Sequence, residues 1–400
     1  MSDFKNLFKL IWKRFSIWIM IFAILTVLLN SLGAREQIKR NEENLRDATY
    51  YMAKDLKVDF PSPGARIDQD YLNKADDLCK TYKEKYNIGI NEDGSYQEGF
   101  DDDDYDYGKI EPVNRYSIIK DFIKEDYDYF NNLILVLLFF VVFISVMITS
   151  LEQSFPYYDF TTMLPWKKRD EVWMKALIVF GLGLVLLLIG ILTNYLVIKT
   201  SIFGNIMNYG NIGSIIAKMA LYMLGTSLLV VATGMISGNF LGHFGLLIIA
   251  FGGIDLIWQN IRVIIDLFDM DMLYKVDTAY SSLIDKIPSI LKPFVSLRFV
   301  DNLYPQLFGF IIVAILYGIL AYLVSQKLSG ENGGFMIVSK PVEKFAKTLG
   351  IISFTSIFYT IVSSILLTNS SIILHLLIYA MGLLIAIKVF GILFKIRLKF

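Results

Sequence analysis

The sequence predicts an all-α integral membrane protein with about eight transmembrane helices, and three observations carry this prediction. First, 55% of the 400 residues are hydrophobic, and they are gathered into long stretches instead of being spread along the chain. Second, each stretch approaches the ~20 residues that an α-helix needs to cross the ~30 Å hydrocarbon core of a bilayer. Third, lysines and arginines are concentrated in alternate loops, as the positive-inside rule requires.

The predicted spans are almost free of charged residues. They cover residues 15–32, 133–151, 176–198, 212–236, 240–257, 307–324, 348–367 and 371–390. Between residues 219 and 254 the chain has no Asp, Glu, Lys or Arg, and this run is too long for one crossing. The chain is therefore expected to turn back at Ser237, Gly238 and Asn239, whose residue types favour a break in the helix.

The basic residues set the expected orientation. They gather in the amino-terminal tail, in the segment after the second span, in the segment after the sixth span and in the carboxy-terminal tail. The short loops between these segments carry only Lys199 or no basic residue. Both termini are therefore expected in the cytoplasm of a multi-pass protein of the cell (plasma) membrane, with residues 34–130 extracellular.

Zero net charge conceals a separation of charge along the chain. Residues 34–130 contain 24 acidic and 15 basic residues, a net charge of −9, so the remainder of the chain carries +9. We expect a mixed, acidic extracellular domain here, with helices around residues 36–56 and 69–85. Its acidic run at residues 101–104 could attract cations or a basic peptide, or could serve only to keep a surface domain soluble.

The expected organisation follows from these spans and loops. In chain order it begins with a cytoplasmic interfacial amphipathic helix (1–14), the first span (15–32) and the extracellular domain (33–130). A core of spans two to six follows (131–325), which includes a cytoplasmic segment (152–175) and an external amphipathic loop (259–304). The chain ends with a cytoplasmic loop (326–347) and the last two spans with a basic cytoplasmic tail (348–400).

Catalytic motifs are absent from the sequence. His243 and His375 have no Cys or second His at metal-ligand spacing, and no nucleophile-elbow or zinc-protease motif occurs. The Gly108-Lys109 dipeptide lacks the earlier glycine and the Ser or Thr of a nucleotide-binding loop. We therefore expect no enzyme, no cofactor and no metal site in this chain, and no nucleic-acid partner. If the protein uses ATP and Mg²⁺, another polypeptide binds them.

Two charged residues within the predicted spans are candidates for function, because intramembrane charges are costly. Lys218 and Asp255 lie on consecutive antiparallel spans, at roughly 27 and 22 Å from the turn at 237–239 when ~1.5 Å is counted per residue. Similar depth would permit an ion pair near the outer leaflet. Such a pair could simply join two helices, or it could be a polar element of a translocation pathway.

The segment after the second span has a recognisable pattern. An aromatic-Asp-Phe sequence is followed by Leu-Pro, a basic cluster and a lysine that opens the next span; these are Tyr158, Asp159 and Phe160, then Leu164 and Pro165, then Lys167, Lys168 and Arg169, then Lys175. This pattern resembles the cytoplasmic coupling segment of permease (transmembrane) subunits of type-2 ABC transporters, the exporter-like class.

Three further features agree with this resemblance, which covers residues 1–325. Residues 2–14 are similar to the family's interfacial connecting helix, the loop 259–304 to its external re-entrant helices, and Glu331 with Gly334 to a Glu-x-x-Gly element of related bacterial permeases. The large first external segment and the last two spans depart from the family's six-span pattern.

The resemblance implies a function and a contact surface. It implies a permease subunit that exports or extrudes a peptide, antibiotic or lipid-like substrate. A separate ABC nucleotide-binding subunit would hydrolyse the ATP. A second permease subunit would be the partner in a homo- or heterodimer within the lipid bilayer. The implied coupling residues are Tyr157, Tyr158, Asp159, Phe160, Met163, Leu164, Pro165, Trp166, Lys167 and Lys168. The alternative is a membrane-anchored sensor or scaffold whose acidic ectodomain binds a ligand or peptide; an intramembrane enzyme is disfavoured by the missing catalytic groups.

Overall fold

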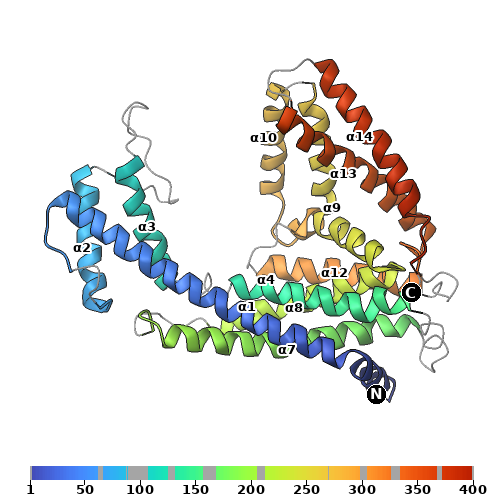
Figure 1. Cartoon of the computed structure of the whole chain (residues 1–400), viewed down its shortest axis with the longest axis horizontal. Coiled ribbons are helices and arrows are strands. Elements are labelled where there is room, and N and C mark those ends of the chain that lie inside the picture. The colour runs from blue at the N-terminus through green and yellow to red at the C-terminus, as the bar shows by residue number, and fades with distance from the viewer. Residues whose placement is uncertain are drawn as a thin grey trace. The chain divides into compact units, whose positions relative to one another are not determined.

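The computed structural model describes residues 2–61, 66–86, 88, 107–124, 131–155, 168–204, 212–268, 270–297, 304–325, 334–366 and 372–398 (Figure 1). Within these ranges the regular structure is helical, apart from one β-bridge. Eight of the described helices are long and apolar enough to cross a membrane. They are Phe4–Leu56, Leu133–Ser154, Asp170–Lys199, Ile212–Ile236, Phe240–Asp266, Tyr304–Ser325, Lys340–Ile365 and Ile372–Leu393. The prediction of an all-α multi-pass membrane protein with eight spans is thus confirmed by helix length and hydropathy.

The chain divides into two compact units. Unit 1 consists of Met1–Ile21, Leu138–Leu184 and Lys218–Phe400, and unit 2 of Phe22–Leu137 and Val185–Ala217. The boundaries fall inside the first four of these helices, so each of the four contributes to both units. A separate domain between the first and second spans, which the sequence had predicted, is therefore not shown.

The first helix, α1 (Ser2–Leu56), is 55 residues long. At 1.5 Å per residue it measures ~80 Å, so it continues well beyond a bilayer core. It combines in one helix the predicted interfacial segment, the first span and the first external helical run, since no proline interrupts it. In unit 1 it buries Leu7, Ile11, Phe15 and Ile19, whose four-residue spacing places them on one face.

Two helices of unit 2 follow α1. They are α2 (Gln69–Tyr86), where the sequence predicted a helix at 69–85, and α3 (Tyr107–Lys124). The Tyr116 hydroxyl on α3 donates a hydrogen bond of 2.8 Å to Asp76 Oδ1 on α2. Burial and the neighbouring carboxylate raise the pKa of Tyr116, so its hydroxyl remains a donor. The buried residues of α2 are Tyr71, Leu72, Ala75, Leu78, Cys79 and Tyr82.

A buried amide pair joins α1 to α7 (Lys168–Lys199) within unit 2. Asn30 Nδ2 donates to Asn194 Oδ1 at 2.6 Å, and the two residues are 1% and 0% exposed. Hydrogen bonds between polar side chains of neighbouring membrane helices contribute ~0.6–2 kcal/mol each to their association. Asn30 and Asn194 therefore fix the register of α1 against α7.

In unit 1 the second span ends in irregular helix. The α-helix α4 (Asn131–Val146) passes into a π-helix, η3 (Met147–Leu151), and then into the short α5 (Glu152–Ser154). A π-turn contains an extra residue, which rotates the side chains beyond it and is frequent at functional sites. The residues of α5 are all buried.

The next two spans are α8 (Ile212–Ile236) and α9 (Phe240–Asp266), and they meet at the turn expected from the sequence. Asn239 caps α9, because its side-chain oxygen accepts a hydrogen bond of 2.9 Å from the Gly242 amide. Gly242 lies directly under the carbonyl of Met336, and a side chain there would overlap it. This close approach requires glycine.

Helix α9 is broken at Gly253, which has φ 52° and ψ −135°. Figure 1 shows the resulting bend, with α10 (Met270–Lys286) beside the second half of α9. The chain then forms the short α11 (Lys292–Val295), and the Ser296 hydroxyl donates to the Phe251 carbonyl at 3.2 Å. The segment after α9 therefore returns to the break in α9.

The last three long helices are α12 (Tyr304–Ser325), α13 (Lys340–Leu366) and α14 (Ile372–Leu393). Helix α13 packs against α14 and the second half of α9 (Figure 1). Asn260 Nδ2 on α9 donates to Ser353 Oγ on α13 at 3.0 Å. Residues Leu267, Tyr359 and Ile378 form the buried cluster where the three helices meet.

Candidate functional site

Four charged side chains form a buried cluster in unit 1, where the second span ends and the third begins. Glu152 on α5 accepts a hydrogen bond from Arg14 Nη1 on α1 and one from Lys175 Nζ on α7, both at 2.8 Å and on different carboxylate oxygens. Lys175 Nζ also contacts Glu171 Oε1 at 2.6 Å. The side chains of Lys175, Glu152 and Glu171 are 0%, 3% and 10% exposed, and that of Arg14 is 25% exposed. We name these four residues the ionic cluster.

The ionic cluster has two positive and two negative charges, so it is neutral as a whole. Burial of a single ion costs several kcal/mol, and a close partner of opposite charge offsets this cost only when the geometry is good. Each charge here has at least one partner within 2.8 Å. Removal of any one member would leave a net charge in a buried place, which makes the cluster sensitive to substitution.

Three members of the ionic cluster flank the implied coupling residues, which run from Tyr157 to Lys168. Glu152 precedes the stretch 156–167 in the chain, whereas Glu171 and Lys175 follow it on α7. The implied coupling residues from Tyr157 to Lys167 lie outside the described residues, and Lys168 is described only as the first residue of α7. Their predicted roles stay predictions. The two chain segments that lead into and out of this stretch are held together by Glu152 and Lys175.

A second polar group adjoins the ionic cluster through η3. The Ser150 hydroxyl lies 3.0 Å from His243 Nδ1 on α9, and His243 Nε2 lies 2.8 Å from the Val230 carbonyl on α8. A carbonyl only accepts, so Nε2 carries the proton and Nδ1 accepts from Ser150. Because His243 is completely buried, this neutral tautomer uses both ring nitrogens and ties the second, fourth and fifth spans together.

The turn between α8 and α9 receives a strand-like segment from the sequence after α12. Ser237 forms a β-bridge with Ile337, and the Val338 amide donates to the Ile236 carbonyl at 3.2 Å. The last residue of the Glu-x-x-Gly element, Gly334, has φ 89°. Its carbonyl accepts from Asn239 Nδ2 at 2.9 Å and from the Leu398 amide at 2.8 Å. The Gly334 carbonyl therefore contacts both the turn and the carboxy-terminal tail. Glu331, the first residue of the element, lies outside the described residues.

Among the described residues Lys218 and Asp255 each contact a tyrosine, and the predicted pair between them stays a prediction. The ammonium of Lys218 lies over the ring of Tyr304, 5.5 Å from its centroid, and Asp255 Oδ1 accepts from the Tyr280 hydroxyl at 3.2 Å. The depth estimate assumed that α9 is straight, but the break at Gly253 lies between the turn and Asp255. The break redirects the second half of the helix towards α10.

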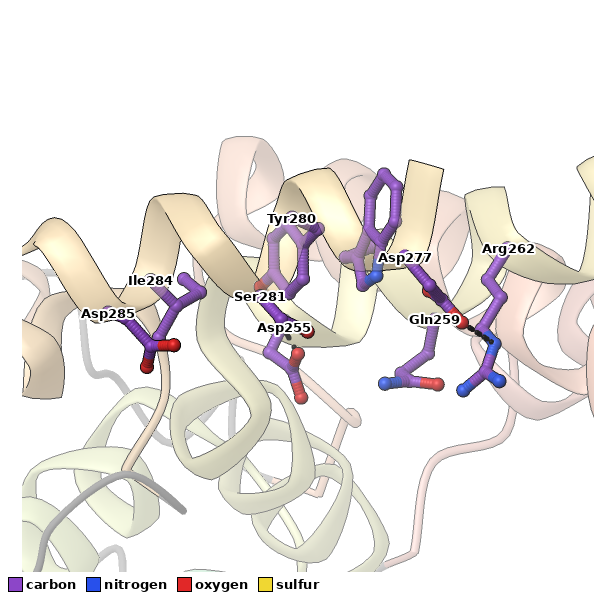
Figure 2. A pocket seen from close by; sticks show the side chains of 9 residues that line it. Asp255, Gln259, Arg262, Asp277, Tyr280, Ser281, Ile284 and Asp285 are labelled. Atoms are coloured by element: carbon purple, nitrogen blue, oxygen red, sulfur yellow. Dashed lines mark hydrogen bonds and ion pairs between the residues drawn. The ribbon is translucent and has the colours of Figure 1, made fainter. Parts of the chain in front are cut away.

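Asp255 instead lines a cavity of about 250 Å³ between the second half of α9 and α10. Arg262 Nε on α9 and Asp277 Oδ2 on α10 form an ion pair of 2.9 Å, and Trp258 stacks on Tyr280 with ring centroids 4.4 Å apart. Figure 2 shows Asp255, Tyr280 and Ser281 between this ion pair on one side and Ile284 with Asp285 on the other. Gln259 also lines the cavity and lies on the side of the ion pair.

The sequence placed Lys175 in the pattern that resembles a coupling segment, Arg14 in the basic amino-terminal tail and Glu171 in the charged segment after the second span. It did not indicate a role for Glu152. A usable signal existed, because Glu152 follows the second predicted span directly and Lys175 precedes the third directly. Charged residues at the limits of apolar spans are candidates for burial. What the spacing alone did not show is that Arg14, 138 residues away, contacts the same carboxylate.

Comparison of the chain with protein-family models, with curated proteins and with solved structures gives no match.

Proposed function

We propose that this chain is the membrane-spanning permease subunit of an ABC transporter, which exports or extrudes a peptide, antibiotic or lipid-like substrate. A separate nucleotide-binding subunit hydrolyses the ATP. The observation that carries the proposal is the ionic cluster, since it fastens together the two ends of the segment that resembles a coupling segment. A loop that only connects two spans would not need contacts that hold α1, α5 and α7 together at its ends.

Force transmission explains why such a base is useful. When the nucleotide-binding subunits close on ATP, they displace residues 156–167. Because Glu152 and Lys175 hold the flanks at 2.8 Å, the flanks move together instead of absorbing the displacement separately. Arg14 passes the movement to α1, and His243 passes it from η3 to α8 and α9. The connected spans can then move together.

The same proposal sets the orientation in the membrane. Residues 156–167 and both termini face the cytoplasm, where ATP is available, and the extension of α1 with α2 and α3 is extracellular. The positive-inside distribution of lysine and arginine supports this orientation. The second permease subunit of the transporter is a copy of this chain or a related chain.

The test uses the full chain with an affinity tag, co-expressed with the proposed nucleotide-binding subunit. Phe160→Asp combined with Leu164→Asp should leave membrane insertion intact and abolish both co-purification of the ATPase and substrate-stimulated ATP hydrolysis. Loss of a buried apolar anchor commonly costs ~2 kcal/mol or more in binding, about a thirtyfold loss of affinity. The matched control is Leu283→Asp, an exposed leucine on α10, which should assemble normally.

Normal assembly and coupling of the Phe160/Leu164 double variant would contradict the permease proposal. The sensor or scaffold alternative, in which residues 34–130 bind a ligand, would then become the better explanation.

A further inference from the structure

The α9–α10 cavity has no part in the proposed coupling mechanism. Among its lining residues Asp255 and Ile284 are buried, at 3% and 8% exposed, whereas Ser281 and Asp285 are exposed. A cavity of about 250 Å³ lies just below the range of ~300–1,000 Å³ typical of sites for drug-sized ligands. It therefore suits a small molecule or one terminal group of a larger molecule.

The polarity of this cavity is unusual for its place in the chain. Asp255 and Arg262 belong to a helix that qualifies as a membrane span. Charged groups on such helices are costly unless they face a polar cavity, and they commonly mark substrate pathways. Arg262 is already paired with Asp277, and the described residues of the lining carry three carboxylates and one guanidinium. The net charge of −2 favours an occupant with positive charge.

The aromatic pair gives the occupant a second means of recognition. Trp258 and Tyr280 are stacked nearly parallel, with an interplanar angle of 11°. Aromatic faces attract cations, and the attraction increases when water is excluded. The Tyr280 hydroxyl also donates to Asp255, so the ring pair and the buried carboxylate are held in one arrangement. A carboxylate beside aromatic rings is chemistry that recognises an organic ammonium group.

We propose that the α9–α10 cavity binds an organic cation, with the ammonium group near Asp255 and Asp285 and the organic part against Trp258 and Tyr280. The inference rests on the proposed function in one respect, because it makes amine-bearing molecules the substrate class of the transporter. The binding itself requires only this chain.

The experiment measures binding to the purified full chain in lipid nanodiscs at constant ionic strength. The probe is phenylethylammonium, and 2-phenylethanol is its uncharged counterpart. Isothermal titration gives the dissociation constants, and tryptophan fluorescence with a Trp258→Phe control shows whether the probe reaches the stacked pair. The expected result is at least tenfold tighter binding of the ammonium, together with a fluorescence change that the control abolishes.

Variants locate the charge that is responsible. Asp285→Asn, at an exposed position, should fold normally and weaken ammonium binding severalfold; Asp255→Asn should weaken it at least tenfold. Asp59→Asn removes one exposed carboxylate elsewhere and should change nothing. Equal affinity for the ammonium and the alcohol, or unchanged ammonium binding in the Asp285→Asn variant, would overturn the proposal.

The binding experiment and the test of the permease proposal can fail independently of each other. Ammonium binding without any ATPase partner would leave the cavity as a cation site and reject only its role in transport. Normal coupling to an ATPase without ammonium binding would reject the cavity as a cation site and leave the permease proposal in place.

Discussion

Charge balance in the ionic cluster leads to a prediction about paired substitutions. Lys175→Met removes the only described cation within contact of Glu171 and one of the two that contact Glu152. The cluster then carries a net charge of −1 at side chains that are 3% and 10% exposed. Breaking a buried ion pair in this way costs ~3–5 kcal/mol in the free energy of unfolding. Glu171→Gln should be of similar severity, because it leaves the cluster with a net charge of +1.

The combination of both substitutions should cost less than either alone. It restores neutrality and leaves the Arg14–Glu152 pair at 2.8 Å intact. The contacts of Lys175 with Glu171 and with Glu152 Oε2 are lost, for which ~1–3 kcal/mol is expected. The difference from the sum of the single losses is several times the ~0.5 kcal/mol within which independent sites add.

Equilibrium unfolding in mixed micelles with increasing SDS, followed by tryptophan fluorescence, measures these free energies. Lys74→Met is the control, since Lys74 and Asp70 form an ion pair with exposed side chains and should contribute nothing measurable. If the double variant loses as much as the two single variants together, the four charges do not act as one neutral unit and the reasoning fails.

Two further predictions concern the orientation of the chain and the break in α9. Cysteines placed at the exposed positions Lys340 and Asp59 should react with a membrane-impermeant reagent from the cytoplasmic and the extracellular side, respectively; labelling of both from one side would contradict the eight-span orientation. Gly253→Ala should destabilise the protein by ~1–3 kcal/mol, because the backbone conformation there is open only to glycine and the added Cβ would lie 2.5 Å from the Val295 carbonyl oxygen. Gly245→Ala in the same helix has open space and should be neutral or slightly stabilising in the same unfolding assay, so equal effects would show that Gly253 does not determine the bend.

The helices were predictable because their signals are local. Runs of apolar residues longer than a bilayer core, with basic residues between alternate runs, are properties of short stretches of sequence, and so is the turn at Ser237, Gly238 and Asn239. The unbroken length of α1 was less evident, because an exposed helix with charged residues and a soluble domain have similar composition.

The contacts between helices were not predictable in the same way. The proposed Lys218–Asp255 pair followed from counting residues along straight helices, and a single glycine with positive φ invalidated that count. Adjacent glycines are visible at 252 and 253, but glycine also occurs where a membrane helix continues unbroken, as Gly245 does in the first half of α9. The shared carboxylate of Glu152 depends on the packing of α1 against the later spans. The periodicity of the sequence does not predict this packing.

The way Glu152 shares its two oxygens also determines an order of events during synthesis. Arg14 leaves the ribosome 138 residues before Glu152, which at ~5–20 residues per second is on the order of 10 s. During that interval the guanidinium can remain among hydrated lipid headgroups. Glu152 then supplies its first partner and closes a neutral pair. Glu171 and Lys175, four residues apart on α7, arrive later as a pair that is already neutral, so the nascent chain inserts each of these helices without ever burying an unbalanced charge.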